Sequence, residues 1–310
     1  MFSLPKGLTG ARWWPHFLLT GAMFLFASDV IVGRLAADLD IPPLGLAFWR
    51  TAGAAAILTP FVGRELILQR HELWRCRGVL VVLGLTISVI GSAAVYSGLA
   101  RTTALNGGVV TTAQAAITVM LGWLLFRDRI GWRAAAGLVV AAIGVLAILC
   151  RGEVATLSAF EPQLGDLLVL IGVTGYALYV VILRRAPHIS LFALLCVTSW
   201  LGALFNAPLY GWETVTDRAF AYTPETLAVI VWISLFVSIG AIGGISAGAM
   251  RVGAQVTGAY SYVRTVFVAA LAVAVAVLGE AIAPFHLAGA ALIIVGVLLV
   301  NLRRGAVKPD

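Results

Sequence analysis

The chain has 310 residues, of which 61% are hydrophobic and 11% are charged, and its formal net charge is +7. Soluble globular proteins carry about 25% charged residues, so a water-soluble fold is excluded and a lipid bilayer is the expected surrounding. The basic residues fall in short clusters between apolar runs, which is typical of membrane proteins and not of nucleic-acid binders.

Runs of about 20 apolar residues, the length that a membrane-spanning helix needs, follow one another along the chain. Many of their boundaries carry proline, glycine or charged residues. The first run is too long for a signal peptide, and no small-residue cleavage site closes it, so we expect no cleaved leader. The sequence predicts ten spans, at 14–36, 43–62, 78–98, 104–126, 132–149, 165–183, 190–210, 225–249, 255–279 and 284–302.

Lysine and arginine predict the orientation of these spans. With the N-terminus inside, 15 basic residues lie in the inner segments, four lie outside, and Arg50 and Arg264 lie within spans. Because inner loops carry the excess of basic residues, we expect both termini in the cytoplasm.

Two ionisable residues lie at the same depth in the first two spans. Asp29 is about seven residues from the outer end of its span, and Arg50 about seven from the outer start of the next, which places both roughly 10 Å below the outer edge. One interpretation is a buried Asp29–Arg50 ion pair that fixes the helical hairpin. The other is that one or both face a central cavity and contact substrate or exchange protons.

An internal repeat divides the chain. "FRDRIGWRAAAGLVVAAIGVL" (126–146) aligns with "LGEAIAPFHLAGAALIIVGVL" (278–298) at an offset of 152, so that Asp128 meets Glu280 and Gly137 and Gly144 meet glycines. Two halves of five spans each must be inverted relative to one another, because five is odd. We therefore expect an all-α integral membrane protein of two inverted five-helix repeats, residues 1–150 and 151–310, with the site where they meet near mid-membrane.

Arg264 lies about nine residues into the ninth span from the inner side, with no acidic residue expected at its depth. Its long side chain could extend to the inner interface. Alternatively, its guanidinium faces the cavity and binds the carboxylate of an amino acid or organic acid, with Asp29 available for an ammonium group.

Further polar and aromatic side chains within the spans complete the candidate site. Tyr176 and Tyr179 are three residues apart and share one helical face, and a tyrosine within the membrane needs a partner for its hydroxyl. We predict that the substrate contacts Asp29, Arg50, Tyr96, Gln114, Tyr176, Tyr179, Trp232, Tyr262 and Arg264.

Four segments resemble the drug/metabolite transporter superfamily, in particular its EamA-type ten-helix branch: "PPLGLAFWRTAGAAAIL" (42–58), "LLFRDRIGWRAAAGLVVAAIGVLAI" (124–148), "GDLLVLIGVTGYALYVVILRR" (165–185) and "VLGEAIAPFHLAGAALIIVGVLLV" (277–300). The resemblance implies a bacterial inner-membrane carrier with an inverted repeat that commonly exports amino acids or related metabolites. The ninth span lacks the proline that many relatives carry in its middle and has Arg264 instead.

These patterns predict a secondary transporter that moves a small polar metabolite by alternating access, as a monomer or homodimer in the bilayer, with amino-acid export as the leading function. An organic-cation transporter with Asp29 as counter-charge is the alternative, disfavoured by Arg50 and Arg264. A membrane-embedded enzyme and a non-transporting scaffold are alternatives of another class. No catalytic, nucleotide-binding or metal-binding pattern occurs, so we expect no catalytic residues, no metal, no cofactor and no nucleic-acid partner.

Overall fold

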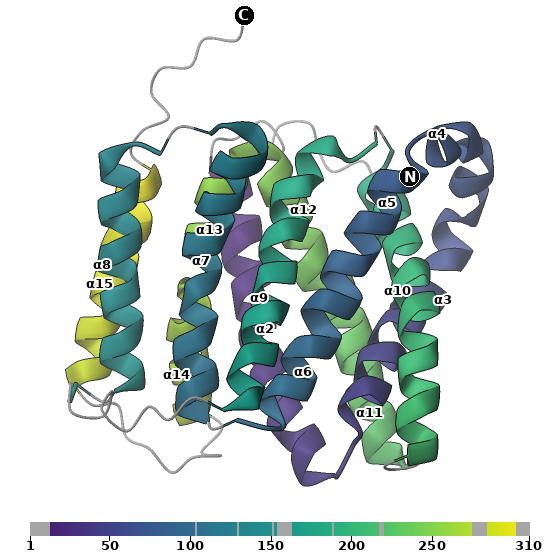
Figure 1. Cartoon of the computed structure of the whole chain (residues 1–310), viewed down its shortest axis with the longest axis horizontal. Helices are drawn as coiled ribbons and strands as arrows, with labels where there is room; N and C mark the ends of the chain where they lie inside the picture. Colours follow the sequence, from purple (N-terminus) through teal and green to yellow (C-terminus); the bar gives the residue numbers. More distant parts are fainter. Residues whose placement is uncertain are drawn as a thin grey trace, which may run out of the picture.

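A computed structural model describes residues 13–102, 104–128, 130–150, 152–153, 163–187, 189–216, 220–274 and 284–301. Within these ranges the chain is helical and contains no strand. The helices run roughly side by side from one end of a bundle to the other (Figure 1). The architecture therefore agrees with the predicted all-α class.

The elements follow one another in two sets. The first half of the chain holds α2 (Trp14–Asp38), α3 (Pro43–Leu68), α4 (Arg70–Arg75), α5 (Arg77–Gly84), the π-helical η1 (Leu85–Ala93), α6 (Ala94–Leu99), α7 (Ala104–Phe126) and α8 (Trp132–Leu149). The second half holds α9 (Leu164–Ile182), the 3-10 turn η3 (Leu183–Arg185), α10 (Leu191–Thr216), α11 (Pro224–Trp232), the π-helical η4 (Ile233–Ala241), α12 (Ile242–Val252), α13 (Ala254–Tyr260), α14 (Val263–Ala274) and α15 (Pro284–Asn301).

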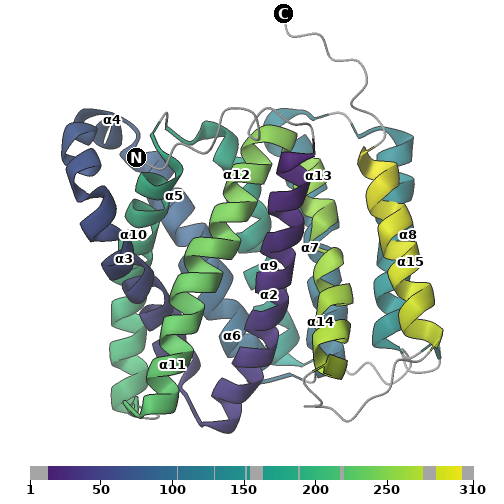
Figure 2. The same ribbon diagram turned by 180° about the vertical axis from the view of Figure 1, so that it is seen from behind.

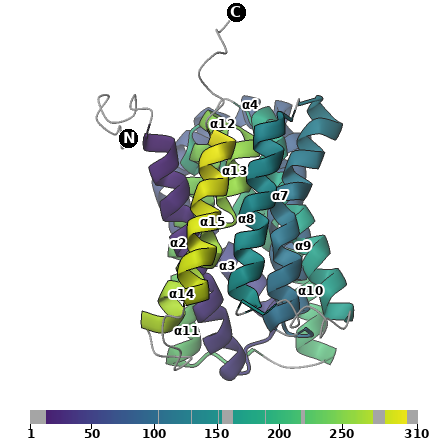
Figure 3. The ribbon, with the colours of Figure 1, turned by 90° about the vertical axis from the view of Figure 1, so that its left-hand side faces the viewer.

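The two sets are intermixed in space. The paired helices α8 and α15 form one flank of the bundle, and α3 and α10 pack together at the other flank (Figures 1 and 2). The first described turn of α2 and the last turn of α15 lie at the same end of the bundle (Figure 3). Both flanks therefore join one helix of the first half to one of the second.

Eight helical runs in the described part of the chain are long and apolar enough to cross a membrane, and the apolar stretch of α7, Val110–Phe126, is shorter. These eight runs correspond to predicted spans one to three, five to eight and ten. Many large apolar side chains on these helices are exposed, as expected for helices that face lipid. The protein is thus a multi-pass membrane protein, while the fourth and ninth predicted spans stay predictions.

The predicted ninth span is interrupted. Helix α13 ends at Tyr260, Ser261 and Tyr262 form a turn, and α14 restarts at Val263. Backbone N–H groups of Ser261 and Tyr262 bond to carbonyls three residues earlier, at 3.1 and 3.3 Å, which is the tighter spacing of a helix end. The break occurs without a proline, and the last residues of the predicted span, 275–279, lie outside the described part.

Two π-helical segments occupy equivalent places in the chain. Each lies in the middle of the third long run of its half, η1 between α5 and α6 and η4 between α11 and α12. π-Helical segments are rare overall, and those that occur often lie at functional sites. The backbone of η1 also approaches α9 closely: a Cβ on Gly175 would lie 2.7 Å from the nitrogen of Gly91.

The helices α8 and α15 cross at four glycines. A Cβ on Gly137 would lie 2.5 Å from the carbonyl oxygen of Gly296, and a Cβ on Gly144 would lie 2.6 Å from that of Gly289. Only glycine permits such backbone approach, as at other close helix pairs in membranes. The first glycine of one helix thus faces the last glycine of the other.

Candidate functional site

A small central cavity of about 30 Å³ lies between helices of both halves. Its walls combine aliphatic and aromatic side chains with a few polar groups, the composition expected of a small-molecule site. The lining residues are Met23, Phe26, Ile87, Gln114, Tyr176, Tyr179, Val180, Ile242, Ile245, Ser261 and Arg264. Four of the nine predicted site residues therefore share one cavity.

Arg264 enters this cavity from the second position of α14, directly after the break in the ninth predicted span. Its guanidinium makes no hydrogen bond or ion pair with any residue that the structure describes. Arg264 is thus a cation open to the cavity, with its five N–H donors available for a ligand.

Gln114 faces the same cavity from α7. Its side chain is 7% exposed, and its Oε1 atom has no hydrogen-bond partner. A buried acceptor without a partner costs about 1–3 kcal/mol, so a donor supplied by a ligand or water is expected there.

Tyr176 and Tyr179 reach the cavity from one face of α9, as predicted from their spacing. Their hydroxyl groups are held by serines: Tyr176 donates to Ser92 Oγ at 3.3 Å, and Tyr179 lies 2.8 Å from Ser246 Oγ. With the hydroxyls occupied, the ring faces are the surfaces that a ligand would contact.

Asp29 and Arg50 are connected through Tyr96. The Tyr96 hydroxyl donates to the carboxylate of Asp29, at 3.2 and 3.3 Å from its two oxygens, and accepts a bond from Nη1 of Arg50 at 3.0 Å. Arg50 Nε donates to Ser238 Oγ at 3.0 Å. The tyrosine hydroxyl thus stands between the two charges, where a direct ion pair was one of the two interpretations. The equal depth predicted for them is what lets one hydroxyl bridge both.

A second, smaller cavity of about 10 Å³ lies beside Arg50. Arg50 is 0% exposed, and its Nη2 atom has no partner. The walls are rich in hydroxyl groups from four elements of the bundle. They consist of Arg50, Thr51, Ile87, Ser92, Leu195, Thr198, Ser199, Ser238 and Ile242.

Four predicted site residues line neither of these cavities: Asp29 and Tyr96, which are hydrogen-bonded to each other, and Trp232 and Tyr262. Trp232 is 37% exposed and packs on Phe236, with ring centroids 4.4 Å apart. Tyr262 is buried in the turn between α13 and α14. Their roles in binding stay predictions.

Sequence reasoning missed the serines that hold the polar network and the two isoleucines between the cavities. Ser92, Ser238 and Ser246 are buried and hydrogen-bonded across helices, and a hydroxyl inside a predicted span was the available signal. For Ile87 and Ile242 no such signal exists, since isoleucine is the ordinary residue of a membrane helix.

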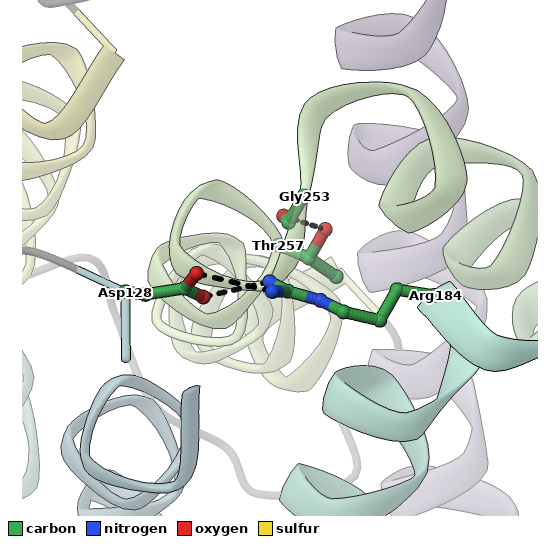
Figure 4. Close-up of polar contacts among 4 residues, drawn as sticks. All are labelled: Asp128, Arg184, Gly253 and Thr257. Carbon is green, nitrogen blue, oxygen red and sulfur yellow. Dashed lines mark hydrogen bonds and ion pairs between the residues drawn. The ribbon is translucent and has the colours of Figure 1, made fainter. Parts of the chain in front are cut away.

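At one end of the bundle an ion pair joins the two halves. Arg184 donates from Nη1 and Nη2 to the two oxygens of Asp128, at 3.0 and 2.7 Å, and its guanidinium lies 4.2 Å from the ring centre of Phe126. Figure 4 shows the two side chains pointing toward each other. The same view shows Gly253, whose φ of 82° suits glycine and whose carbonyl accepts a bond from Thr257 at 2.9 Å.

The described residues contain no group of three His, Cys, Asp or Glu side chains that could hold a metal ion. No disulfide joins Cys76, Cys150 and Cys196. The expected lack of a metal or cofactor stays a prediction.

Comparison with known proteins adds to this geometry. The model of the EamA-like transporter family matches residues 13–150 and again residues 163–302. The chain belongs to the EamA-like transporter family. The two matches also give this EamA-like chain a two-repeat architecture, in agreement with the predicted superfamily.

Several proteins resemble this EamA-like chain. Two from Bacillus subtilis (strain 168), the "Uncharacterized transporter YetK" and the "Uncharacterized transporter YyaM", are each 26% identical, over 94% and 91% of this chain and 87% and 89% of their own lengths. A solved structure titled "Crystal structure of protein" has a TM-score of 0.72 at 16% identity, covering 94% of this chain and 98% of that one. The last comparison supports the fold alone.

Proposed function

We propose that this protein is a secondary transporter that moves a small carboxylate-bearing metabolite, with an amino acid as the leading candidate, out of a bacterial cell across the inner membrane. Transport occurs by alternating access between two inverted five-helix halves. The observation that carries the substrate class is Arg264, whose guanidinium faces the central cavity without a described partner.

The cavity suits both polar ends of an α-amino acid. Arg264 offers a planar pair of donors that matches a carboxylate. Gln114 offers an unpartnered acceptor that matches an ammonium group. The start of α14 lies next to Arg264, and the positive end of a helix dipole at a broken helix favours an anionic group there.

Two features support inverted halves. The π-helical segments η1 and η4 lie in the third long run of each half. The aligned glycines pack crosswise, Gly137 on Gly296 and Gly144 on Gly289, although Gly137 aligns with Gly289 and Gly144 with Gly296 in the sequence repeat. Crosswise contact between equivalent residues is what a two-fold axis between α8 and α15 produces.

The rival substrate class, organic cations, is less well matched. The interior holds two arginines and one aspartate at the site, namely Arg50, Arg264 and Asp29, so the local balance is positive. Asp29 is already bonded by Tyr96, whereas the guanidinium of Arg264 is open to the cavity and would repel a cation.

Binding of an acid and of its primary amide to the purified protein tests this proposal. Wild type is expected to bind the acid, and Arg264→Ala is expected to weaken acid binding about 10- to 100-fold because a charge-assisted bidentate contact is lost. Amide binding is expected to change little. Arg264→Lys keeps the charge but loses the planar fork, so an intermediate loss is expected. Equal losses for acid and amide contradict the proposal.

A further inference from the structure

The two cavities are separated by a pair of isoleucines, one from each half. Ile87 of η1 and Ile242 of α12 are the two residues that line both cavities. They are 8% and 9% exposed, so each side chain is packed between the two spaces. Both are placed by the π-helical segments, since Ile87 lies within η1 and Ile242 directly follows η4.

The second cavity is lined mainly by acceptors. The hydroxyls of Thr51, Thr198, Ser92 and Ser238 donate to backbone carbonyls, at 2.9, 2.9, 3.0 and 3.4 Å. Each hydroxyl therefore has its proton engaged and keeps acceptor capacity on its oxygen, although Ser92 and Ser238 already accept one bond each, from Tyr176 and Arg50. The one donor known to be unused is Nη2 of Arg50.

These groups select the chemistry of an occupant. It must accept a bond from Arg50 and donate to hydroxyl oxygens, and a primary carboxamide does both. A carboxylate only accepts, and an alkyl end leaves Nη2 unpaired. The charge of Arg50 is already offset by Asp29 through Tyr96, so a neutral group fits the electrostatic balance.

We propose that the cavity beside Arg50 is a second subsite that takes a terminal carboxamide of the substrate, and that Ile87 and Ile242 form the partition that limits substrate length. The inference rests on the proposed binding of a carboxylate at Arg264. The substrate class it names is a carboxylic acid or amino acid with a neutral amide at its far end.

Two series of linear carboxylates, lengthened one methylene at a time, test the proposal on the full chain in detergent. One series ends in a carboxamide and the other in a methyl group. In Ile242→Ala and Ile87→Ala the long carboxamides are expected to gain about tenfold or more in affinity, because the shortened side chain joins the cavities and Arg50 acquires a partner. Long alkyl carboxylates are expected to gain less, so the readout is the gain of a carboxamide relative to the alkyl probe of the same length in the same variant.

Ile245→Ala is the matched control. Ile245 lies on α12 three residues after Ile242, is 8% exposed, and lines only the first cavity. Its truncation enlarges that cavity without opening the partition, so carboxamide and alkyl probes are expected to respond alike. If an alanine variant does not fold, Ile242→Val and Ile87→Val remove only one carbon. They are expected to show the same selective gain in affinity for long carboxamides, but a smaller one.

The outcomes separate the two proposals. If wild type binds no short carboxylate, the proposed function is wrong and the subsite falls with it. If wild type binds short carboxylates through Arg264 but the partition variants show no selective gain for long carboxamides, the subsite alone is overturned. A gain of equal size in Ile245→Ala also overturns it.

Discussion

Asp128 and Arg184 form a bidentate ion pair, with N–O distances of 3.0 and 2.7 Å. It joins the segment that follows α7 in the first half to η3, which follows α9 in the second. Both side chains are partly exposed, so the pair is expected to contribute only about 0–1 kcal/mol to stability. Because the pair joins the two halves, the proposed alternating access would require it to break when the halves move apart at this end.

We predict that this ion pair separates when its end of the bundle opens. Asp128→Cys combined with Arg184→Cys, in a background without Cys76, Cys150 and Cys196, places a thiol at each position. A short bifunctional thiol cross-linker is expected to abolish transport in liposomes, and uncross-linked protein is expected to remain active. The single-cysteine variants, treated alike, serve as controls, and full transport after cross-linking contradicts the prediction.

Tyr96→Phe is expected to destabilise the protein because one hydroxyl joins two charged groups. The loss leaves Asp29 and one Arg50 nitrogen with fewer partners, at a cost of about 1–3 kcal/mol. Thermal unfolding in detergent measures it. Tyr222→Phe removes an exposed hydroxyl that contacts Tyr210 at 3.0 Å and is expected to have a small effect. Equal effects of the two substitutions contradict the bridging role.

Gln114→Leu is expected to weaken binding of an amino acid more than binding of the same carboxylic acid without its amino group. The reason is that the unpartnered Oε1 of Gln114 is the acceptor offered to the ammonium. One such contact corresponds to about 1–3 kcal/mol, or roughly 5- to 100-fold in affinity. Calorimetric titration with both ligands measures the difference. Equal losses of affinity for both ligands would mean that Gln114 contributes to packing and not to recognition of the ammonium group.

Gly144→Ala is expected to destabilise the pairing of α8 and α15, because its Cβ would lie 2.6 Å from the carbonyl oxygen of Gly289. Overpacking of this kind costs about 1–3 kcal/mol. Gly211→Ala is the control, since a Cβ there meets no atom within 4 Å and alanine stabilises a helix by about 0.5–1 kcal/mol relative to glycine. A lowered melting temperature for both variants contradicts the crossing.

The excess of basic residues in the predicted inner segments, 15 against four, predicts a cytoplasmic C-terminus. A reporter fused after Asp310 that is active only in the cytoplasm is expected to be active, and one that is active only outside is expected to be silent. The opposite pattern contradicts the predicted orientation.

The sequence by itself determined the membrane environment, the helical class and the family. Apolar runs long enough to cross a bilayer leave the helix as the one structure that satisfies their backbone groups without strand pairing, and the signal is local. The sequence also indicated Asp29, Arg50 and Arg264 as candidates. Placing an ionisable side chain within the membrane costs free energy, so such residues usually have a function.

Only the tertiary structure decided which of these residues meet. The equal depth of Asp29 and Arg50 could be predicted from the sequence, but the position of Tyr96 between them depends on where α6 lies relative to α2 and α3. The helix break before Arg264 could not be predicted from the sequence, because no proline occurs there. The partition by Ile87 and Ile242 arises from helix packing, because two residues typical of any membrane helix gain a role only where two cavities adjoin.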